Sequence, residues 1–209
     1  MPTPILRQLD FPNIFTLCGL MFSLISAIFA IQGNFYASAI GMIFAGLTDM
    51  LDGFLARKIE RSELQSEVGK QLDSIVDVCS FGFAPAIFAY CFGLQDFVSL
   101  TVLIFYVGVN ALRLAYFNST GLISEEKEEY FNGLPVTYAA LFIPLTFTAS
   151  LLLSDLTMKF ILDGVYLALG IAMVANFKML KIRGIWYVIF GIGAMVITAI
   201  YTWAIIAGK

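Results

Sequence analysis

The stretch DMLDGFLARKIERSELQSEVGKQLDSIVD occupies residues 49–77 and lies between long apolar segments. An unpaired charged side chain at the centre of a bilayer costs about 3 kcal/mol, so four of them would cost about 12 kcal/mol. Such a cost indicates that the carboxylates in this stretch have a specific role. The four aspartates concerned are Asp49, Asp52, Asp73 and Asp77.

The composition defines the class of protein. Of 209 residues, 60% are hydrophobic and 13% are charged, and the mean hydropathy is +0.89. A soluble domain of this size needs more polar surface, and the apolar runs are long enough to cross about 30 Å of hydrocarbon as helices. We therefore predict an all-α polytopic transmembrane helical bundle. We expect residues 1–209 to form one integral-membrane catalytic domain, with a motif-bearing core in 1–155 and C-terminal transmembrane helices in 156–209.

The hydropathy pattern predicts about seven helices. The last apolar segment is long enough to form two shorter spans, so six to eight helices fit the pattern. The predicted helices cover residues 12–31, 35–57, 69–92, 97–118, 136–153, 159–176 and 185–207.

The cysteines and the absence of histidine exclude several kinds of site. Cys18, Cys79 and Cys91 lie in apolar stretches without metal-ligand spacing, which is typical of buried small side chains. The chain contains no histidine, so histidine-based catalysis and histidine-ligated metals are excluded.

The distribution of Lys and Arg predicts the orientation in the cell membrane. With the N-terminus in the cytoplasm, only Lys159 and Lys209 lie outside. All four aspartates then lie near cytoplasmic helix ends, so we expect the active site near the cytoplasmic face. The ten basic residues on the inner side are Arg7, Arg57, Lys58, Arg61, Lys70, Arg113, Lys127, Lys178, Lys181 and Arg183.

The spacing of the aspartates predicts that they converge. Asp49 and Asp52 are three residues apart, and Asp73 and Asp77 are four apart, so each pair shares one face of its helix. The connection between the two helices is short, which makes them antiparallel neighbours. The two pairs of carboxylates can therefore meet.

A cluster of carboxylates is typical of a site for hard cations. Oxygen ligands suit Mg²⁺, Mn²⁺ or Ca²⁺ better than zinc or copper, and four carboxylates suit two divalent ions that clamp a phosphoryl group. The alternative is a proton or ion pathway through paired acids, as in a cation transporter.

Small residues and an arginine beside the acids favour a phosphate-bearing ligand. Gly53, Ala56 and Gly69 lack bulk and would let a large group approach the helix backbones, although helix packing also favours small residues. Arg57 is suited to a diphosphate oxygen, or else is an interfacial arginine.

Together these residues form a pattern that resembles the signature of a known enzyme family, the CDP-alcohol phosphotransferases. These are integral membrane enzymes that join a CDP-activated group to an alcohol and release CMP. Residues 58–68 form a longer spacer than is usual in the family, and we expect the connection to absorb the extra length. The matching pattern is Asp49-x2-Asp52-Gly53-x2-Ala56-Arg57, followed by Gly69-x3-Asp73-x3-Asp77.

Three further segments resemble the integral-membrane phosphatidylserine synthases within this family. They are LDSIVDVCSFGFAPA (72–86), LRLAYFN (112–118) and FNGLP (131–135). The resemblance implies CDP-diacylglycerol and L-serine as substrates, contact with membrane lipids, a homodimer, and no nucleic-acid partner. Acceptors such as glycerol phosphate, inositol phosphate or choline are the alternatives within the family.

The resemblance also implies roles for individual residues. Asp49, Asp52 and Asp73 would ligate the metal ions, with Asp77 completing the metal site and acting as the general base. Asp52 would also contact the CDP-lipid together with Gly53, Ala56, Arg57 and Gly69.

The acceptor side of the site is predicted from the other blocks. Arg113 is suited to gripping the carboxylate of serine, and Asn118 to hydrogen-bonding the amino acid. Asn132 lies in a segment that could shape a loop around the acceptor. We therefore predict these three residues as the serine-binding set.

Overall fold

The computed structural model describes residues 4–56, 58–121, 123–125, 128–180 and 185–208. Most of these residues belong to helices. The main helices are α1 (Phe11–Ile31), α2 (Phe35–Ala56), α3 (Glu63–Asp77), α4 (Ala84–Phe92), α5 (Phe97–Thr120), α6 (Ala139–Phe147), α7 (Asp155–Val174) and α8 (Ile185–Ile206).

Two of the membrane segments combine several helical forms. A π-helical turn, η2 (Val78–Phe83), joins α3 to α4, so that 63–92 is one continuous helix. The 3-10 turns η3 (Val136–Tyr138) and η4 (Thr148–Leu151) extend α6 at its two ends. The seven predicted segments therefore correspond to the observed ones, with the fifth less regular than predicted. A further 3-10 turn, η1 (Ile5–Gln8), precedes α1.

The fold class is confirmed. Within the described residues, five helical segments are long and apolar enough to cross a membrane: α1, the α3–α4 helix, α5, α7 and the part of α8 from Tyr187. The protein is an all-α polytopic integral membrane protein.

The third helix begins earlier than predicted, at Glu63 instead of residue 69. Ser62 caps this helix. Its hydroxyl accepts a hydrogen bond from the backbone N–H of Gln65, and the side-chain oxygen of Gln65 accepts one from the backbone N–H of Ser62. This capping box stabilises a first turn that is too polar to be recognised from hydropathy. Much of the long spacer before Gly69 is therefore helical.

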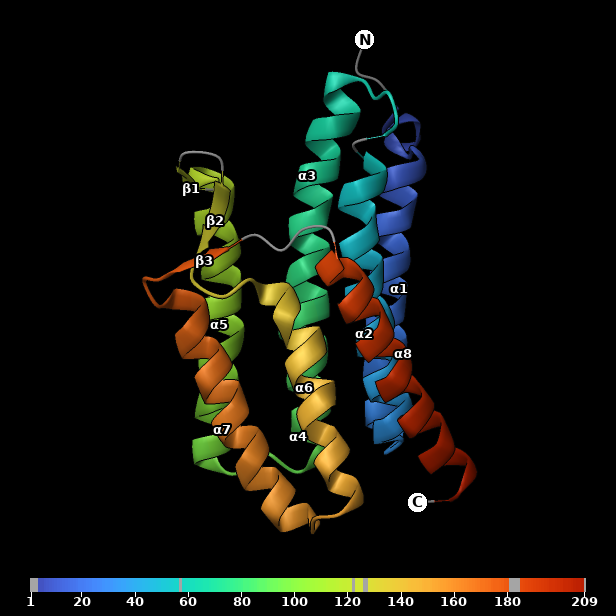
Figure 1. Cartoon of the computed structure of the whole chain (residues 1–209), viewed down its shortest axis with the longest axis vertical. Helices are drawn as coiled ribbons and strands as arrows, with labels where there is room; N and C mark the ends of the chain where they lie inside the picture. Colours follow the sequence, from blue (N-terminus) through green and yellow to red (C-terminus); the bar gives the residue numbers. More distant parts are fainter. Residues whose placement is uncertain (1–3, 57, 122, 126–127, 181–184, 209) are drawn as a thin grey trace.

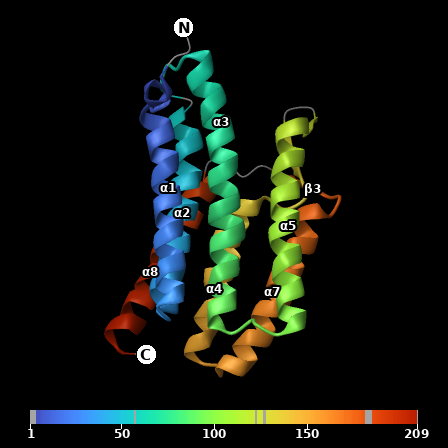
Figure 2. The ribbon, with the colours of Figure 1, turned by 180° about the vertical axis from the view of Figure 1, so that it is seen from behind.

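The helices lie in two groups, with α3–α4 and α6 between them (Figures 1 and 2). On one side α1 packs along α2, and α8 crosses α2; on the other side α5 packs along α7. The N-terminus, the α2–α3 connection and a small sheet all lie toward one end of the bundle (Figure 1).

Buried tyrosines tie these helices together. Tyr106 donates to the carbonyl of Phe81, Tyr166 to that of Pro85 at 2.5 Å, and Tyr201 to that of Pro144. A lipid environment offers no water to hydrogen-bond a free carbonyl or hydroxyl, so such bonds specify which helices pack together.

A three-stranded antiparallel sheet was not predicted from the sequence. It consists of β1 (Ile123–Glu125), β2 (Glu128–Asn132) and β3 (Lys178–Leu180), in the order β1-β2-β3. Phe131 is paired with Met179, almost fifty residues away in the sequence. The sheet fixes the segment that follows α5 and holds Phe131 beside that helix.

Candidate active site

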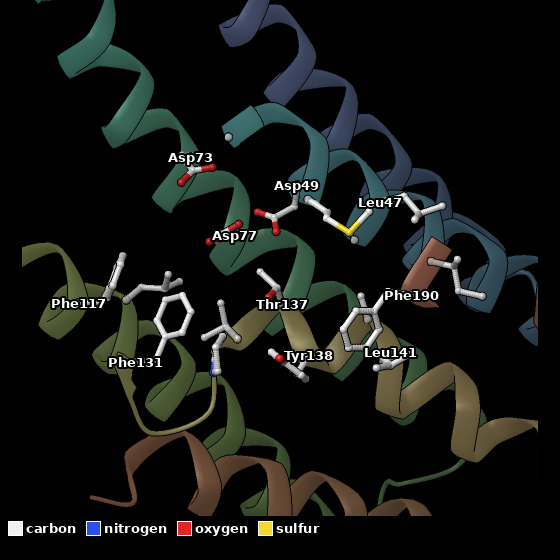
Figure 3. A pocket seen from close by; sticks show the side chains of 18 of the residues that line it. Leu47, Asp49, Asp73, Asp77, Phe117, Phe131, Thr137, Tyr138, Leu141 and Phe190 are labelled. Carbon is white, nitrogen blue, oxygen red and sulfur yellow. The ribbon is translucent and has the colours of Figure 1, made fainter. Parts of the chain in front are cut away.

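Carboxylates from α2 and α3 form one cluster. Oxygen atoms of Asp49, Asp52 and Asp73 all lie within 4.8 Å of one another. The Asp77 carboxyl group lies against that of Asp49, and both point into the space between the two helices (Figure 3). The structure thus brings together all four aspartates singled out in the sequence.

The α1 helix contributes to this cluster. Asp52 is buried, and its Oδ2 accepts a hydrogen bond of 3.1 Å from the Thr16 hydroxyl. Thr16 belongs to α1, and no pattern in the sequence indicated that it contacts an acid. The salt bridges of the described residues involve none of the four aspartates. Within the described part of the chain, their negative charges are thus not balanced by salt bridges.

The donor set fits a divalent cation. Carboxylate oxygens bind Mg²⁺ and Ca²⁺ at about 2.0–2.6 Å, so two oxygens on one ion lie at most about 5 Å apart. The 4.8 Å limit for Asp49, Asp52 and Asp73 meets this requirement. These residues could hold a metal ion of the kind that prefers oxygen ligands.

A cavity of about 330 Å³ extends from the aspartates into the bundle. One part of its wall is polar and includes Asp49, Asp73 and Asp77; another part is apolar and includes Leu47, Leu141 and Phe190 (Figure 3). The apolar residues come from α2, α6 and α8. A ligand with a charged group and a hydrocarbon part matches this division.

Arg113 faces the aspartates from α5. Arg113 is 7% exposed and lines the cavity. Its guanidinium lies 5.3 Å from the ring centre of Phe117 and 5.6 Å from that of Phe131. Its Nε has no hydrogen-bond partner among the described residues. The arginine is therefore packed against two neighbouring aromatic rings, with its charge near Asp77.

Of the other two residues predicted to bind the acceptor, one lines the cavity and the other does not. Asn118 lines the cavity and donates a 2.6 Å hydrogen bond to the hydroxyl of Ser74, which adjoins Asp73. Asn132 lies at the end of β2, opposite Lys178, and is not among the residues that line the cavity.

The residues predicted to contact the CDP-lipid also differ in where they lie relative to the cavity. Gly53 lines the cavity beside Asp49, and Ala56 is the last residue of α2. Arg57 lies outside the described residues.

Gly69 lies against a polar network at the start of α3. A Cβ at this position would be 2.6 Å from Arg61 Nη2 and 2.6 Å from Asn13 Oδ1. Arg61 in turn binds Asp10 at 2.6 Å and Asn13 at 2.6 Å. The absence of a side chain at Gly69 lets Arg61 and Asn13 connect α1 with α3.

Sequence reasoning missed the aromatic contacts of Arg113. Phe117 is four residues from Arg113 on the same helix, a spacing that could have indicated contact. Phe131 reaches Arg113 only through the sheet, for which the sequence offered no hydropathy signal.

The site and the fold agree with a family comparison. Residues 9–175 match the model of the CDP-alcohol phosphatidyltransferase family. This match covers most of the chain, so the chain belongs to that family and is a transferase of that kind. The resemblance inferred from the aspartate pattern is thereby confirmed.

The similar curated proteins include enzymes named for serine and for choline products. An archaetidylserine synthase of Methanothermobacter thermautotrophicus is 31% identical over 175 residues, covering 83% of this chain and 70% of the relative. A CDP-diacylglycerol–serine O-phosphatidyltransferase of Helicobacter pylori is 30% identical over 173 residues, covering 80% and 70%. A phosphatidylcholine synthase of Borreliella burgdorferi is 32% identical over 126 residues, covering 59% and 51%.

Proposed function

We propose that this protein transfers the phosphatidyl group of CDP-diacylglycerol to the hydroxyl of L-serine, releasing CMP. One observation carries the proposal: a single cavity joins three aspartates of the cluster (Asp49, Asp73 and Asp77), a buried arginine and an apolar wall. These three parts match a diphosphate, an amino-acid carboxylate and a lipid chain. The names of the serine-using relatives support the same acceptor.

The aspartates would bind the donor substrate through two divalent ions, Mg²⁺ or Mn²⁺, with Ca²⁺ as an alternative. Bound there, such ions neutralise the charge of the diphosphate and of the departing CMP. Asp49, Asp52, Asp73 and Asp77 would hold them.

The remaining donor contacts come from small and basic residues. Gly53 leaves room beside the aspartates, and Ala56 and Gly69 belong to the same family pattern. Arg57 would add a charge-assisted hydrogen bond to the diphosphate. The acyl chains would extend along the apolar wall between α2, α6 and α8.

Asp77 is the proposed general base. It lies between Asp49 and the α5 side of the cavity, so a hydroxyl held there can reach its carboxylate. Asp77 takes the proton of the serine hydroxyl while the serine oxygen bonds to the lipid-side phosphorus. The bond from that phosphorus to the bridging oxygen breaks, and the electron pair leaves with CMP.

Arg113 is the proposed partner of the serine carboxylate. A guanidinium can bind a carboxylate through two parallel hydrogen bonds, and choline has no group that needs such a partner. Asn118 would hydrogen-bond the amino acid from the same wall. Asn132 remains a predicted contact of the acceptor loop.

Choline is the second candidate acceptor because of the phosphatidylcholine synthase relative. A choline site has to stabilise a quaternary ammonium, which aromatic faces do well. Phe117 and Phe131 offer such faces, but Arg113 lies against both rings. A buried cation at that place disfavours a second one.

We also propose that the site lies near the cytoplasmic face and that the protein is a homodimer. The first is supported by Lys58, Arg61 and Lys70, which belong to the bundle end that carries the α2–α3 connection. The second is supported by the family resemblance alone. Thiol labelling of a Lys58→Cys variant in sealed vesicles would test the cytoplasmic position of the site. Measurement of the mass of the protein in detergent would test the homodimer.

The experiment that tests the function is product identification. Purified protein is incubated with CDP-diacylglycerol, Mg²⁺ or Mn²⁺, and one acceptor at a time: L-serine, choline, glycerol 3-phosphate or inositol phosphate. Mass spectrometry should find phosphatidylserine and CMP in equal amounts. Absence of CMP release with serine, beside release with another acceptor, would overturn the serine assignment.

A further inference from the structure

A line of polar side chains on α5 faces the α3–η2 helix. Tyr106, Asn110 and Arg113 follow one another at spacings of four and three residues and share one buried face of α5, and Asn118 lies nearer the C-terminal end of the helix. The two ends of this line are hydrogen-bonded across the interface. Tyr106 donates to the carbonyl of Phe81, and Asn118 donates to Ser74.

The two central residues are different. Asn110 is 0% exposed, and neither its Oδ1 nor its Nδ2 has a hydrogen-bond partner among the described residues; the same holds for Nε of Arg113. Leaving a buried polar group unsatisfied costs about 1–3 kcal/mol. Two neighbouring residues with unsatisfied donors and acceptors therefore indicate a hydrogen bond that forms in another state of the protein.

Asn110 lies beside the site but not in it. It is absent from the residues that line the cavity, and its Oδ1 would be 3.2 Å from a Cβ placed on Gly82 of the π-helical turn. Such turns occur frequently at functional sites. Asn110 is thus too deep to touch a ligand in the cavity.

Arg113 and Asn110 are neighbours on one face of α5. They are three residues apart, and side chains in a helix lean toward its N-terminus, so the stem of Arg113 starts one turn above Asn110 and leans toward it. The guanidinium itself lies against Phe117 and Phe131 at the cavity wall. Its Nε–H is an unpartnered buried donor among the described residues and belongs to the residue three positions after the buried amide.

We propose that Asn110 is a positioning residue for the acceptor and acts through Arg113. When the acceptor carboxylate binds the outer N–H groups of Arg113, the amide oxygen of Asn110 accepts the Nε–H bond. This bond fixes the plane of the guanidinium and turns its paired N–H groups toward the cavity. The inference rests on the proposed use of serine, whose carboxylate Arg113 would bind.

The first test is the variant Asn110→Leu, which keeps the size of the side chain and removes its polar atoms. The KM for serine should rise about tenfold, as expected for the loss of one hydrogen bond to a charged group. The kcat should change less than about twofold, and the KM for CDP-diacylglycerol should not change. Equal changes in both KM values would overturn the proposal.

The second test separates positioning from packing. Arg113→Lys keeps the positive charge but has no Nε, so Asn110→Leu should change the KM for serine less than about twofold in that background. The same tenfold rise in both backgrounds would show that Asn110 acts on the fold alone. Additivity of the two substitutions therefore overturns the proposal.

A matched control is Tyr106→Phe, which removes the other buried hydrogen bond of this face. It should lower the melting temperature in detergent and leave the KM for serine unchanged. If it raises that KM as much as Asn110→Leu does, the effect belongs to the α5–η2 contact in general. Turnover of serine by the unmodified protein is measured first. If that turnover is absent, the proposed function fails, whereas the proposal for Asn110 is tested only by comparing the variants with an active protein.

Discussion

The two walls of the cavity differ in how they are built. The α2–α3 wall carries three carboxylates, with Asp52 beside them, on two helices that follow each other in the sequence. The α5 wall carries Arg113 and Asn118, and its arginine is held by Phe131 from a sheet that includes β3. One wall is assembled by a short connection and the other by contacts distant in sequence.

This difference suggests a division of work. The acidic wall suits the charged donor and its ions, because only cations can relieve four crowded carboxylates. The α5 wall offers one fixed cation for an anionic acceptor. Substitutions in the acidic wall should affect catalysis or donor binding, whereas those in the α5 wall should affect the acceptor.

The largest effect is expected for Asp77→Asn, where the two walls meet. Loss of a general base lowers kcat by up to about 10⁴-fold, and binding of CDP-diacylglycerol should be largely retained. Single-turnover CMP release and equilibrium binding of the CDP-lipid measure the two quantities. Near-normal turnover would contradict the assigned role of Asp77.

Asp49→Asn should lower kcat/KM about 10³-fold, equivalent to about 4 kcal/mol, because metal and nucleotide binding weaken together. Chelation by EDTA should abolish turnover of the unmodified protein, and added Mg²⁺ should restore it. The control is Asp155→Asn, which removes an exposed carboxylate at the start of α7. Turnover that persists in EDTA would argue against a metal-dependent site.

Arg113→Ala should raise the KM for serine about 100-fold with little change in the KM for CDP-diacylglycerol. Competitive inhibition by 3-hydroxypropionate, which keeps the carboxylate, should weaken by a similar factor. Inhibition by ethanolamine, which lacks a carboxylate, should not weaken. The control Lys70→Ala removes an exposed charge and should change neither the KM for serine nor the inhibition by 3-hydroxypropionate. If Arg113→Ala weakens inhibition by both compounds equally, Arg113 does not bind the acceptor carboxylate.

The smallest effect on chemistry, but a clear one on stability, is expected for Gly69→Ala. The new Cβ would meet Arg61 and Asn13, and overpacking of this kind costs about 1–3 kcal/mol. Gly108→Ala is the matched control, because a Cβ there has no neighbour within 4 Å. Thermal unfolding in detergent should separate the two variants. Equal melting temperatures would show that the Arg61–Asn13 network yields without cost.

Much of the acidic wall could be predicted from the sequence because helical periodicity is local. Spacings of three and four place Asp49 with Asp52 and Asp73 with Asp77, whatever the rest of the chain does. The early start of α3 was missed because Glu63 and its neighbours are polar, and a capping box rather than burial begins the helix there.

The α5 wall could be predicted only in part. Arg113 stands out as a charge in an apolar segment, but Phe131 reaches it through pairing between β2 and β3. Asn110 was not singled out, because no sequence pattern shows that its buried amide lacks a hydrogen-bond partner among the described residues.

The sequence by itself determined a helical membrane protein with two pairs of acids on neighbouring helices, because hydropathy and spacing act within one helix and across one short connection. Only the tertiary structure decided which α5 residues face those acids and which atoms there lack partners. Those outcomes depend on sheet pairing, on a π-helical turn and on packing between segments far apart in the chain, and these long-range contacts leave no periodic trace in a single sequence.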